Sequence, residues 1–457
     1  MADQPPSRDD PHADNPINVL LVGGGGREHA LATAIARSPR LGTLFATHTT
    51  NPGIAALAKP VDVPVSIREI YRLRTFCDRN AIGLVVVGPE DPLAEGYADE
   101  LATDTRLVFG PSRSAARLEA DKSFAKQLMR SASVPTADAK TFTDYDQAVK
   151  YIVSRREPPV VKAAGLAKGK GVFVTSSLQD ARDAAHAILE RRVFGDAGSA
   201  LLVEEKLTGP EVSVLAFVDG SNIYILETAQ DHKRLNDHDE GPNTGGMGAF
   251  TPSDRLDDAT LAVIQREILV PTIDALRREG IEYQGLLYTG LMLTPAGPKV
   301  LEYNVRFGDP ECQALLPRLE TDLLEVLIAT CEQRLDEIDL VWTPGASVCL
   351  VMAAPGYPES PEKNIPISGL EHAEAVPGVH VFHAGTTLSN GKLVSAGGRV
   401  LNIVATAGTR EAAADLAYEA AAKITFPGAK LRTDIGRVAA PATRRQRPQA
   451  SDLTRTI

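Results

Sequence analysis

The sequence predicts a multidomain protein of the α/β and α+β classes, with an open parallel sheet near its N-terminus and a mixed α/β unit at its C-terminus. Three observations predict this. Continuous apolar runs such as Asn18–Val22 are typical of parallel strands buried on both faces. A glycine-rich loop, Gly165–Gly171, lies between two short strand-like runs in the middle of the chain. After about Asp339, further strand-like runs precede an Ala-rich helical segment, Glu411–Ile424.

Composition limits the classes of protein to consider. The chain has 457 residues, which is enough for several hydrophobic cores. A net charge of −11 argues against a nucleic-acid partner, which needs a basic face. The four cysteines show no metal-ligand spacing and fit reduced thiols of an intracellular protein. The sequence has no membrane-spanning apolar run and no signal-peptide core, so we expect a cytoplasmic protein without membrane or nucleic-acid partners. A monomer is expected as well, although no feature of the sequence determines the oligomeric state.

The first strand is followed by a glycine-rich turn and a helix. Gly23–Gly26 come directly after Asn18–Val22, and an apolar helical pattern begins within a few residues. Backbone N–H groups at a helix N-terminus suit a phosphate. A dinucleotide-binding fold is the obvious alternative, but Glu28 occupies its third glycine position and no acid ends the next strand, Leu44–His48. The turn therefore predicts a site for a smaller phosphate.

Two more strands extend the predicted sheet. Leu84–Val87 runs into a Gly-Pro-Glu-Asp turn, and Leu107–Phe109 runs into a Gly-Pro-Ser turn. Ligands of open α/β sheets bind at the carboxyl ends of the strands, so these turns should lie at one edge. Glu90 could bind sugar hydroxyls or an amine there, although an ordinary surface turn explains it equally well.

The middle of the chain predicts a helix and then a flap. Ser114–Ser131 reads as one helix carrying solvated lysines, and the chain breaks at Val134–Thr136, near a domain boundary. Strands at Val160–Lys162 and Val172–Val174 flank the glycine-rich loop, whose lysines bring charge for phosphates. The loop is not a P-loop, because Lys170 stands where that motif needs glycine.

The segment Val300–Gln313 carries the densest set of polar residues. Alternation predicts a strand whose packing face holds Leu301, Tyr303 and Val305 and whose polar face holds Glu302, Asn304 and Arg306. Adjacent carboxylate and amide oxygens suit Mg²⁺, and a half-exposed structural strand is the alternative. The Gly-Asp-Pro-Glu turn that follows brings two more carboxylates to the same end.

The last region predicts strands around a hairpin. His380–Leu388 and Leu393–Val404 flank an Asn-Gly turn, and Ala346–Ala353 is strand-like. Earlier in the chain, Gln230–Arg234 and Gly241–Ala249 are rich in charge and glycine, so we expect backbone turns and little secondary structure there.

Arg306–Gln313, which reads RFGDPECQ, resembles the signature of the phosphoribosylamine–glycine ligases, which are ATP-grasp enzymes of purine synthesis. The resemblance covers about Asn18 to Gly436. QDHKR (230–234) and GPNTGGMGA (241–249) match that family almost letter for letter, and other ATP-grasp ligases do not need them. Gly24, Ala164 and Thr47–Gly53 depart from its usual pattern.

The resemblance implies a reaction and a layout. ATP would phosphorylate glycine, and the amine of 5-phosphoribosylamine would attack the glycyl phosphate, with Mg²⁺ or Mn²⁺ as the metal. The implied units are a disordered tail (1–16), an N-terminal substrate domain (17–120), a lid region (121–199), a central domain with the metal site (200–338), a C-terminal domain (339–438) and a second disordered tail (439–457).

The resemblance also implies roles for individual residues. The catalytic residues would be Arg306, Asp309 and Glu311, and the metal ligands Glu302 and Asn304. ATP would be bound by Lys122, Lys162, Gly165, Lys168, Gly169, Lys170, Gly171, Glu204, Glu205 and Glu211. The substrates would be bound by Gly25, Gly26, Arg27, Glu28, Pro89, Glu90, Asp231, Lys233, Asn243, Gly245, Gly246 and Met247, with His383 and Arg399 completing the sugar-phosphate pocket.

Three alternatives remain at this point. A different ATP-grasp ligase would keep the flap and the metal strand without QDHKR, GPNTGGMGA and RFGDPE together. A nicotinamide-dependent dehydrogenase would need the dinucleotide fingerprint that is missing here. A non-catalytic nucleotide-binding relative should have lost a metal ligand or a phosphate-binding lysine, and those residues are present.

Overall fold

A computed structural model describes residues 16–167 and 170–437. The tails predicted at 1–16 and 439–457 lie, apart from Pro16, outside the described residues, as do Lys168 and Gly169 of the flap. No helix within the described part of the chain has the length and apolar character needed to cross a membrane.

The N-terminal region is an open parallel sheet, as predicted. Its strands are β1 (Ile17–Val22), β2 (Leu41–Ala46), β3 (Lys59–Pro60), β4 (Ile82–Val87) and β5 (Leu107–Phe109). Its helices are α1 (Gly26–Ala36), α2 (Pro52–Ala55), α3 (Ile70–Arg79), α4 (Glu90–Glu95) and α5 (Tyr97–Leu101). The strand order is β3-β2-β1-β4-β5 and every pairing is parallel. The glycine turn and the Glu90 turn therefore lie at the same edge.

Ser114–Ser131 is not one helix. It contains α6 (Arg113–Ala120) and α7 (Lys122–Ser131), separated by Asp121 in an extended conformation. The Asp121 carboxylate accepts hydrogen bonds from the N–H groups of Ser123 and Phe124, which caps α7. The break orients α7 independently of α6, and it places Lys122 at the first position of a helix.

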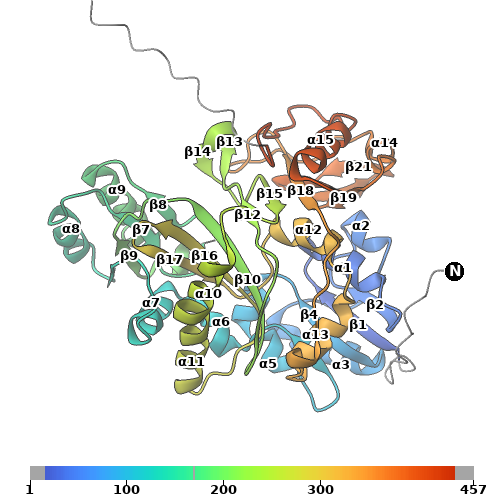
Figure 1. The fold of residues 1–457 in the computed structure, drawn as a ribbon, viewed down its shortest axis with the longest axis horizontal. Helices are drawn as coiled ribbons and strands as arrows, with labels where there is room; N and C mark the ends of the chain where they lie inside the picture. The colour runs from blue at the N-terminus through green and yellow to red at the C-terminus, as the bar shows by residue number, and fades with distance from the viewer. Residues whose placement is uncertain (1–15, 168–169, 438–457) are drawn as a thin grey trace, which may run out of the picture.

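The flap belongs to a small separate body. Its strands are β6 (Ala139–Phe142), β7 (Val160–Ala163), β8 (Val172–Val174) and β9 (Leu201–Glu204), and its helices are α8 (Tyr145–Val153) and α9 (Leu178–Leu189). The antiparallel β7–β8 pair confirms the predicted strands on either side of the glycine-rich loop. This body, at the left in Figure 1, has a hydrophobic core of its own built around Ile152, Val161 and Ile188.

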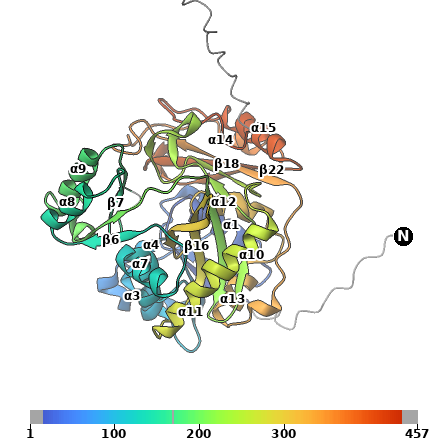
Figure 2. The same ribbon diagram turned by 60° about the vertical axis from the view of Figure 1, so that its left-hand side comes forward.

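The central sheet carries the strand predicted to bear the metal ligands. It consists of β10 (Glu211–Asp219), β11 (Ile223–Ile225), β16 (Gln284–Thr294) and β17 (Gly297–Asn304), in the antiparallel order β11-β10-β16-β17. Its helices are α10 (Asp258–Ile264), α11 (Val270–Arg278), α12 (Glu311–Leu315) and α13 (Leu323–Cys331), with a π-helical turn at Gln265–Leu269. In Figure 2 the central sheet, marked by β16, lies to the right of the flap and below the C-terminal layer.

The predicted alternation of β17 is wrong at its start. Gly290 pairs with Glu302 but Leu291 pairs with Val300, so Leu301 is an extra residue in a β-bulge. Val300 is therefore fully buried, whereas Leu301 is only partly buried. Beyond the bulge the prediction is confirmed, because Tyr303 and Val305 are buried and the polar residues share the other face.

The C-terminal sheet contains β12 (Gln230–Asp231), β15 (Gly248–Thr251), β18 (Ala346–Ala353), β19 (Val379–His383) and β22 (Arg399–Ala407), in the order β12-β15-β18-β22-β19. Its helices are α14 (Leu370–Glu374) and α15 (Arg410–Ala421). Two hairpins accompany it, β13 (Arg234–Asn236) with β14 (Glu240–Asn243) and β20 (Thr386–Ser389) with β21 (Lys392–Ser395).

Two predictions for this part of the chain need correction. The segments 230–234 and 241–249 form strands, because β12 and β15 complete the C-terminal sheet instead of making free turns. The segments 380–388 and 393–404 are each broken into two strands where the hairpin separates from the sheet. The Asn-Gly turn itself is confirmed, since Asn390 and Gly391 have φ of 49° and 74°.

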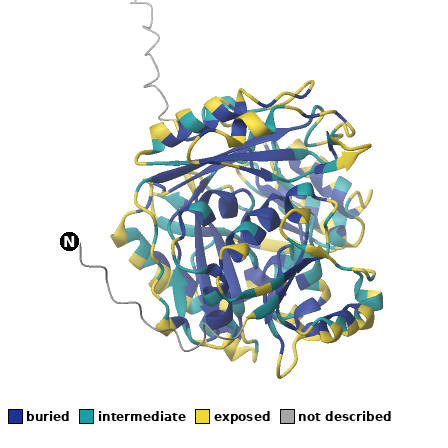
Figure 3. Cartoon of the chain, turned by 90° about the vertical axis from the view of Figure 1, so that its right-hand side faces the viewer, coloured by how far each residue is buried: buried dark blue, intermediate teal, exposed yellow. Residues whose placement is uncertain are grey.

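Two large apolar cores join the N-terminal sheet to the central sheet. One combines Leu20 and Val85 with Leu287 and Val300, and the other combines Val86 with residues of β10 and α13. Figure 3 shows buried residues gathered in the interior of the molecule and exposed residues mainly at its periphery. The N-terminal and central sheets therefore form one packed body, and the edge of β17 lies between this body and the flap.

Candidate active site

The polar face of β17 presents an ionised carboxylate among three lysines. Lys233 Nζ lies 3.3 Å from Glu302 Oε1. The Lys233 ammonium, with smaller contributions from Lys162 and Lys122, lowers the pKa of Glu302 to about 2 against the effect of burial. We refer to Lys122, Lys162, Lys233 and Glu302 as the cationic cluster. It combines three positive charges with one negative charge. This surplus of positive charge favours the binding of an anionic ligand.

The lysines of the cationic cluster come from three separate elements. Lys122 begins α7, and its Nζ donates to Gly165 O at 3.1 Å, while burial lowers its pKa. Lys162 lies on β7, and its Nζ donates to Leu301 O at 3.2 Å, the carbonyl exposed by the bulge. Lys233 follows β12. The predicted phosphate-binding lysines of the flap and the predicted metal strand are thus brought together.

A second charged group surrounds Arg306, just beyond β17. Its guanidinium lies 3.2 Å from Glu90 Oε2 and 3.0 Å from Glu119 Oε1, and it donates to Asn304 Oδ1 at 3.3 Å. We refer to Arg306, Glu90 and Glu119 as the Arg306 cluster. Burial would raise the pKa of Glu90, but Arg306 and Arg27 outweigh it and lower that pKa to about 2. Burial dominates at Glu119 and raises its pKa to about 7, although Arg306 opposes it.

Hydrogen bonds connect the glycine turn, Gly23–Gly26, and the start of α1 to the segment that follows β17. Gly25 N–H donates to Glu28 Oε2 at 2.6 Å, and Arg27 pairs with the other oxygen of Glu28 and donates to Phe307 O at 3.1 Å. A Cβ on Gly26 would lie 2.2 Å from Asn402 Oδ1, so only glycine fits without movement of the buried Asn402 side chain on β22. The predicted residues Arg27 and Glu28 thus hold the turn against the end of β17.

Arg399 connects the C-terminal sheet to the turn after β17. Its Nη1 donates to Asp309 O and Gly245 O at 2.6 Å each, and its Nη2 lies 3.3 Å from the Asp309 carboxylate. Burial would raise the pKa of Asp309, but Arg399 and Arg27 lower it. His383 donates its backbone N–H to His29 Nδ1 at 2.9 Å, beside the glycine turn. Both residues predicted to complete the pocket therefore lie at this edge.

Two acids meet beneath the GPNTGGMGA segment. Burial, followed by the charge of Glu311, raises the pKa of Asp231 well above its usual range. Asp231 Oδ1 is buried without a hydrogen-bond partner in the described structure. Gly246 approaches it with φ +110°, and a Cβ there would lie 2.7 Å from Asp231 Oδ1 and 2.5 Å from Pro310 Cδ. An unpaired carboxyl oxygen beside a second acid can accept a proton or an ammonium group.

Several predicted site residues have other surroundings. Glu204 points inward and pairs with Lys162 at 2.8 Å, and Glu205 pairs with Lys299 at 3.1 Å. Met247 is fully buried, and Asn243 pairs with Arg234 across the β13–β14 hairpin. The remaining predicted residues occur at the edge of the flap or of the sheets: Pro89 precedes α4, Gly165 and Gly171 adjoin β7 and β8, Lys170 is exposed, and Glu211 begins β10 with its Oε2 3.8 Å from Lys233. Lys168 and Gly169 lie outside the described residues.

Sequence reasoning missed three residues of this region. Glu119 accepts the Val305 N–H at 2.8 Å in addition to binding Arg306. Lys126, which we expected in solvent, is buried and paired with Glu204 at 3.3 Å. Asn51 donates to Gly24 O and to His383 O, and so joins the glycine turn to the C-terminal sheet. Each role depends on contacts between distant segments, and the only local signal was the Glu-x-x-Lys-x-x-x-Lys spacing of residues 119–126.

The donor set around β17 fits a hard divalent cation that shares its shell with phosphate oxygens. Glu302 is ionised, and Asn304 offers its amide oxygen on the same face. Among residues 16–167 and 170–437, no group of three or more His, Cys, Asp or Glu side chains could hold a metal ion alone. A metal bound here would need oxygen ligands from substrate and water.

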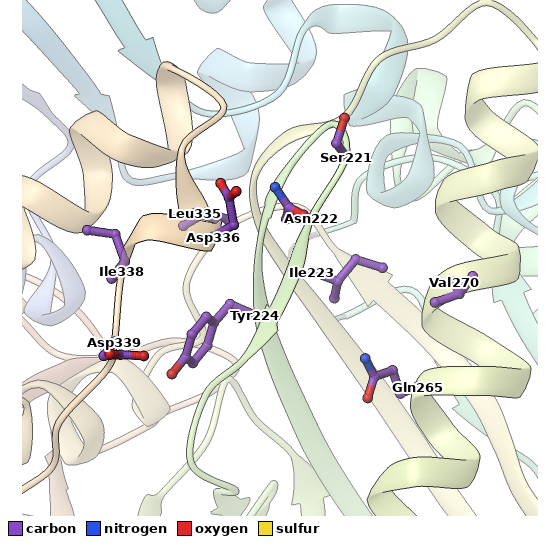
Figure 4. Close-up of a pocket in the computed structure, with 10 residues that line it drawn as sticks. All are labelled: Ser221, Asn222, Ile223, Tyr224, Gln265, Val270, Leu335, Asp336, Ile338 and Asp339. Carbon is purple, nitrogen blue, oxygen red and sulfur yellow. The ribbon is translucent and has the colours of Figure 1, made fainter.

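A surface hollow elsewhere does not share this chemistry. It has a volume of about 450 Å³, lies beside the β10–β11 hairpin and is lined by ten residues that include Tyr224, Asn222 and Asp336 (Figure 4). None of the ten is basic, so the hollow offers no countercharge for a phosphate. The edge of β17 is therefore the candidate active site.

Comparison with known families accounts for most of the chain. Residues 17–119 match the N domain of phosphoribosylglycinamide synthetase, residues 120–312 its ATP-grasp (A) domain and residues 347–438 its C domain. Phosphoribosylamine–glycine ligase of Caldanaerobacter subterraneus is 45% identical over 92% of this chain and 99% of the relative. The enzyme of Rhodopirellula baltica is 48% identical over 92% of this chain and 97% of the relative.

Solved structures agree with these matches. Phosphoribosylamine–glycine ligase of Thermotoga maritima superposes with a TM-score of 0.79 at 31% identity, over 92% of this chain and all of that one. The biotin carboxylase domain of Hydrogenobacter thermophilus 2-oxoglutarate carboxylase, crystallised with MgADP, has a TM-score of 0.70 at 16% identity, over 91% of each chain. The second likeness shows a shared fold.

Proposed function

The chain belongs to the phosphoribosylamine–glycine ligase family, an ATP-dependent ligase family of purine synthesis, and from this premise we propose how its residues perform that reaction. The observation that carries the proposal is the cationic cluster, in which Lys122, Lys162 and Lys233 surround the ionised Glu302. This arrangement supports ligation of glycine to 5-phosphoribosylamine at the edge of β17.

In the first step, a glycine carboxylate oxygen attacks the γ-phosphorus of ATP, which gives glycyl phosphate and ADP. Negative charge develops on the phosphoryl oxygens as the bond to the ADP oxygen breaks. Lys122 and Lys162 stand where fixed positive charge would stabilise this change without rearrangement. The glycines at 165 and 171 allow the flap backbone to approach the phosphates closely.

Mg²⁺ or Mn²⁺ would be held by Glu302 and Asn304 together with phosphate oxygens of the nucleotide. When bound, such an ion neutralises phosphate charge and polarises the transferring group. Glu302 is ionised and able to bind the metal, because the charge of Lys233 lowers the pKa of the carboxyl group. Lys233 would then be free to turn toward a substrate carboxylate or phosphate.

In the second step, the amine of 5-phosphoribosylamine attacks the carbonyl carbon of glycyl phosphate, phosphate leaves and the amine loses a proton. Asp231 and Glu311 would accept the ammonium group of glycine, which matches the unpaired Asp231 oxygen. Arg306 and Asp309 would orient the reacting groups from the turn after β17. The glycine turn with Arg27 and Glu90 would bind the sugar phosphate at the edge of the parallel sheet.

The test is ADP release from Mg-ATP with glycine and freshly generated phosphoribosylamine, added separately and together. Turnover that requires both substrates is the expected result. Turnover with another acid or amine would overturn the substrate assignment but not the ATP-dependent chemistry. Tight binding of Mg-ATP without any turnover would identify a non-catalytic member of the family and direct attention to Ala164 and Thr47–Gly53.

A further inference from the structure

Three charged side chains are buried together where the flap meets the central sheet. Lys126, Lys162 and Glu204 are 7%, 6% and 3% exposed. Lys162 Nζ lies 2.8 Å from Glu204 Oε2, and Lys126 Nζ lies 3.3 Å from Glu204 Oε1. Each lysine therefore lies beside its own oxygen of one carboxylate, although Glu204 Oε1 accepts no hydrogen bond and its contact with Lys126 is an ion pair alone. The three side chains together carry one positive charge in excess.

The position of Lys126 is fixed by further contacts. Its Nζ donates to Thr136 Oγ1 at 2.7 Å, and the Thr136 hydroxyl donates to Val300 O at 2.6 Å. Burial lowers the pKa of Lys126, and Glu204 opposes that shift. Lys126 is thus held against β17, two residues before Glu302.

One lysine would be enough to neutralise Glu204. Removing an ammonium group from water is costly, so a second buried lysine on the same carboxylate is unfavourable for folding alone. The second lysine, Lys126, matters for the net charge that Lys162 presents. With Lys126 absent, Glu204 and Lys162 would form a neutral pair, and Lys162 would present little net charge to the cationic cluster.

We propose that Lys126 is a positioning residue for nucleotide binding, because it shares Glu204 and so leaves the charge of Lys162 available to the nucleotide phosphates. The inference rests on the proposed function, in which Lys162 binds phosphate. Lys126 itself is remote from solvent and reaches the nucleotide only through Glu204 and Lys162.

The experiment measures Mg-ADP affinity by titration calorimetry, with the KM for ATP, the KM for glycine and kcat determined in parallel. Lys126→Gln removes the charge but keeps a donor for Thr136, and Lys126→Met removes both. We expect either variant to weaken Mg-ADP binding and raise the KM for ATP about tenfold, with the KM for glycine nearly unchanged. Thermal unfolding confirms that each variant is folded.

The double variant Lys126→Gln/Glu204→Gln separates positioning from structure. It removes the carboxylate that would neutralise Lys162, so Mg-ADP affinity should return to within about threefold of wild type. A purely structural role for Lys126 predicts no such rescue.

Wild-type affinity in a folded Lys126 variant would overturn the proposal, as would a double variant as weak as the single one. Failure of both single variants to fold would assign Lys126 a structural role and also overturn it. Lys162→Met tests the premise separately. If that variant binds Mg-ADP normally, the phosphate role of Lys162 is wrong, whatever Lys126 does.

Discussion

The two charged groups on either side of the end of β17 have opposite compositions. The Arg306 cluster places one arginine between two glutamates, and the cationic cluster places one glutamate among three lysines. In the first, the guanidinium reaches both carboxylates, and Arg27 lies 4.0 Å from Glu90 as a further positive charge. In the second, the four residues sum to two positive charges, and Glu204 and Glu211 lie against its edge, 2.8 Å from Lys162 and 3.8 Å from Lys233.

This difference separates a charge-balanced cluster from one with a surplus of positive charge. Like charges held close together repel one another, so the repulsion within the cationic cluster is relieved when an anion binds. The Arg306 cluster has no such surplus and instead joins the parallel sheet, through Glu90 and Glu119, to the end of β17. Variants in the two clusters should therefore differ in what they damage.

The largest effect should come from the single carboxylate of the cationic cluster. Glu302→Ala removes a proposed metal ligand and the carboxylate that lies 3.3 Å from Lys233, so we expect kcat to fall by roughly 10³-fold or more. The fold should persist, since 32% of the Glu302 side chain is exposed. ADP release measures the first effect, and circular dichroism measures the second.

Glu267→Gln is the matched control, because Glu267 is exposed and lies outside both clusters. It should retain wild-type activity. Wild-type turnover in Glu302→Ala would show that the ionised carboxylate has no role in the reaction, and the comparison between the clusters would lose its functional meaning.

The next largest effect concerns stability and comes from Glu119 of the Arg306 cluster. Burial raises the pKa of Glu119 to about 7 from its ordinary value of 4.5, so the folded chain holds a proton there that the unfolded chain releases. The stability associated with protonated Glu119 is complete below about pH 4.5 and is lost as pH rises to about 7. The whole change amounts to about 3 kcal/mol.

Glu119→Gln cannot ionise, so its unfolding temperature relative to wild type should rise between pH 5 and pH 8. Scanning calorimetry at several pH values measures that difference. Glu371→Gln, at an exposed acid, should show no such trend. A constant difference between Glu119→Gln and wild type would mean that Arg306 keeps Glu119 ionised throughout this pH range.

A smaller loss of stability should follow from crowding the glycine turn. In Gly26→Ala the new Cβ would lie 2.2 Å from Asn402 Oδ1 and 2.7 Å from Gln313 Nε2, both in packed elements. We expect destabilisation of about 2 kcal/mol, measured by denaturant unfolding. Gly408→Ala is the control, because nothing lies within 4 Å of its Cβ position. Equal stability of the two variants would show that the turn is not held by the C-terminal sheet.

Much of this architecture follows from local patterns. A continuous apolar run such as Asn18–Val22 predicts a strand buried on both faces of a parallel sheet. An Asn-Gly pair between two strands predicts a hairpin turn. The bulge at Leu301 and the break at Asp121 were not predictable, because each is decided by what the neighbouring segment pairs with or caps. The pairing of β15 with β18 likewise joins segments about a hundred residues apart, and β12 joins the sheet through β15.

The site residues that could be predicted are those whose side-chain type indicates their ligand, such as a carboxylate for a metal or a lysine for a phosphate. Glu302, Asn304 and the two lysines at 122 and 162 do converge at one edge. Glu119 and Lys126 were not predictable, because their chemistry comes from burial, and an amphipathic helix pattern cannot show which charged residues will face another domain. Glu204 was expected to bind the nucleotide, and that role stays a prediction; its contacts with Lys126 and Lys162 were not predictable, because they depend on the inward orientation of its side chain on β9.

The smallest expected effect concerns the flap, which should close on the cationic cluster when nucleotide phosphates cancel its surplus charge. Lys170 is exposed on the described part of the loop, so trypsin should cleave after it in the free enzyme. Mg-ATP should slow this cleavage several-fold, whereas AMP, which lacks the β- and γ-phosphates, should not. Lys170→Gln identifies the cut by abolishing it. Equal cleavage with and without Mg-ATP would contradict this prediction. It would mean that phosphates bind the cationic cluster without any movement of the flap.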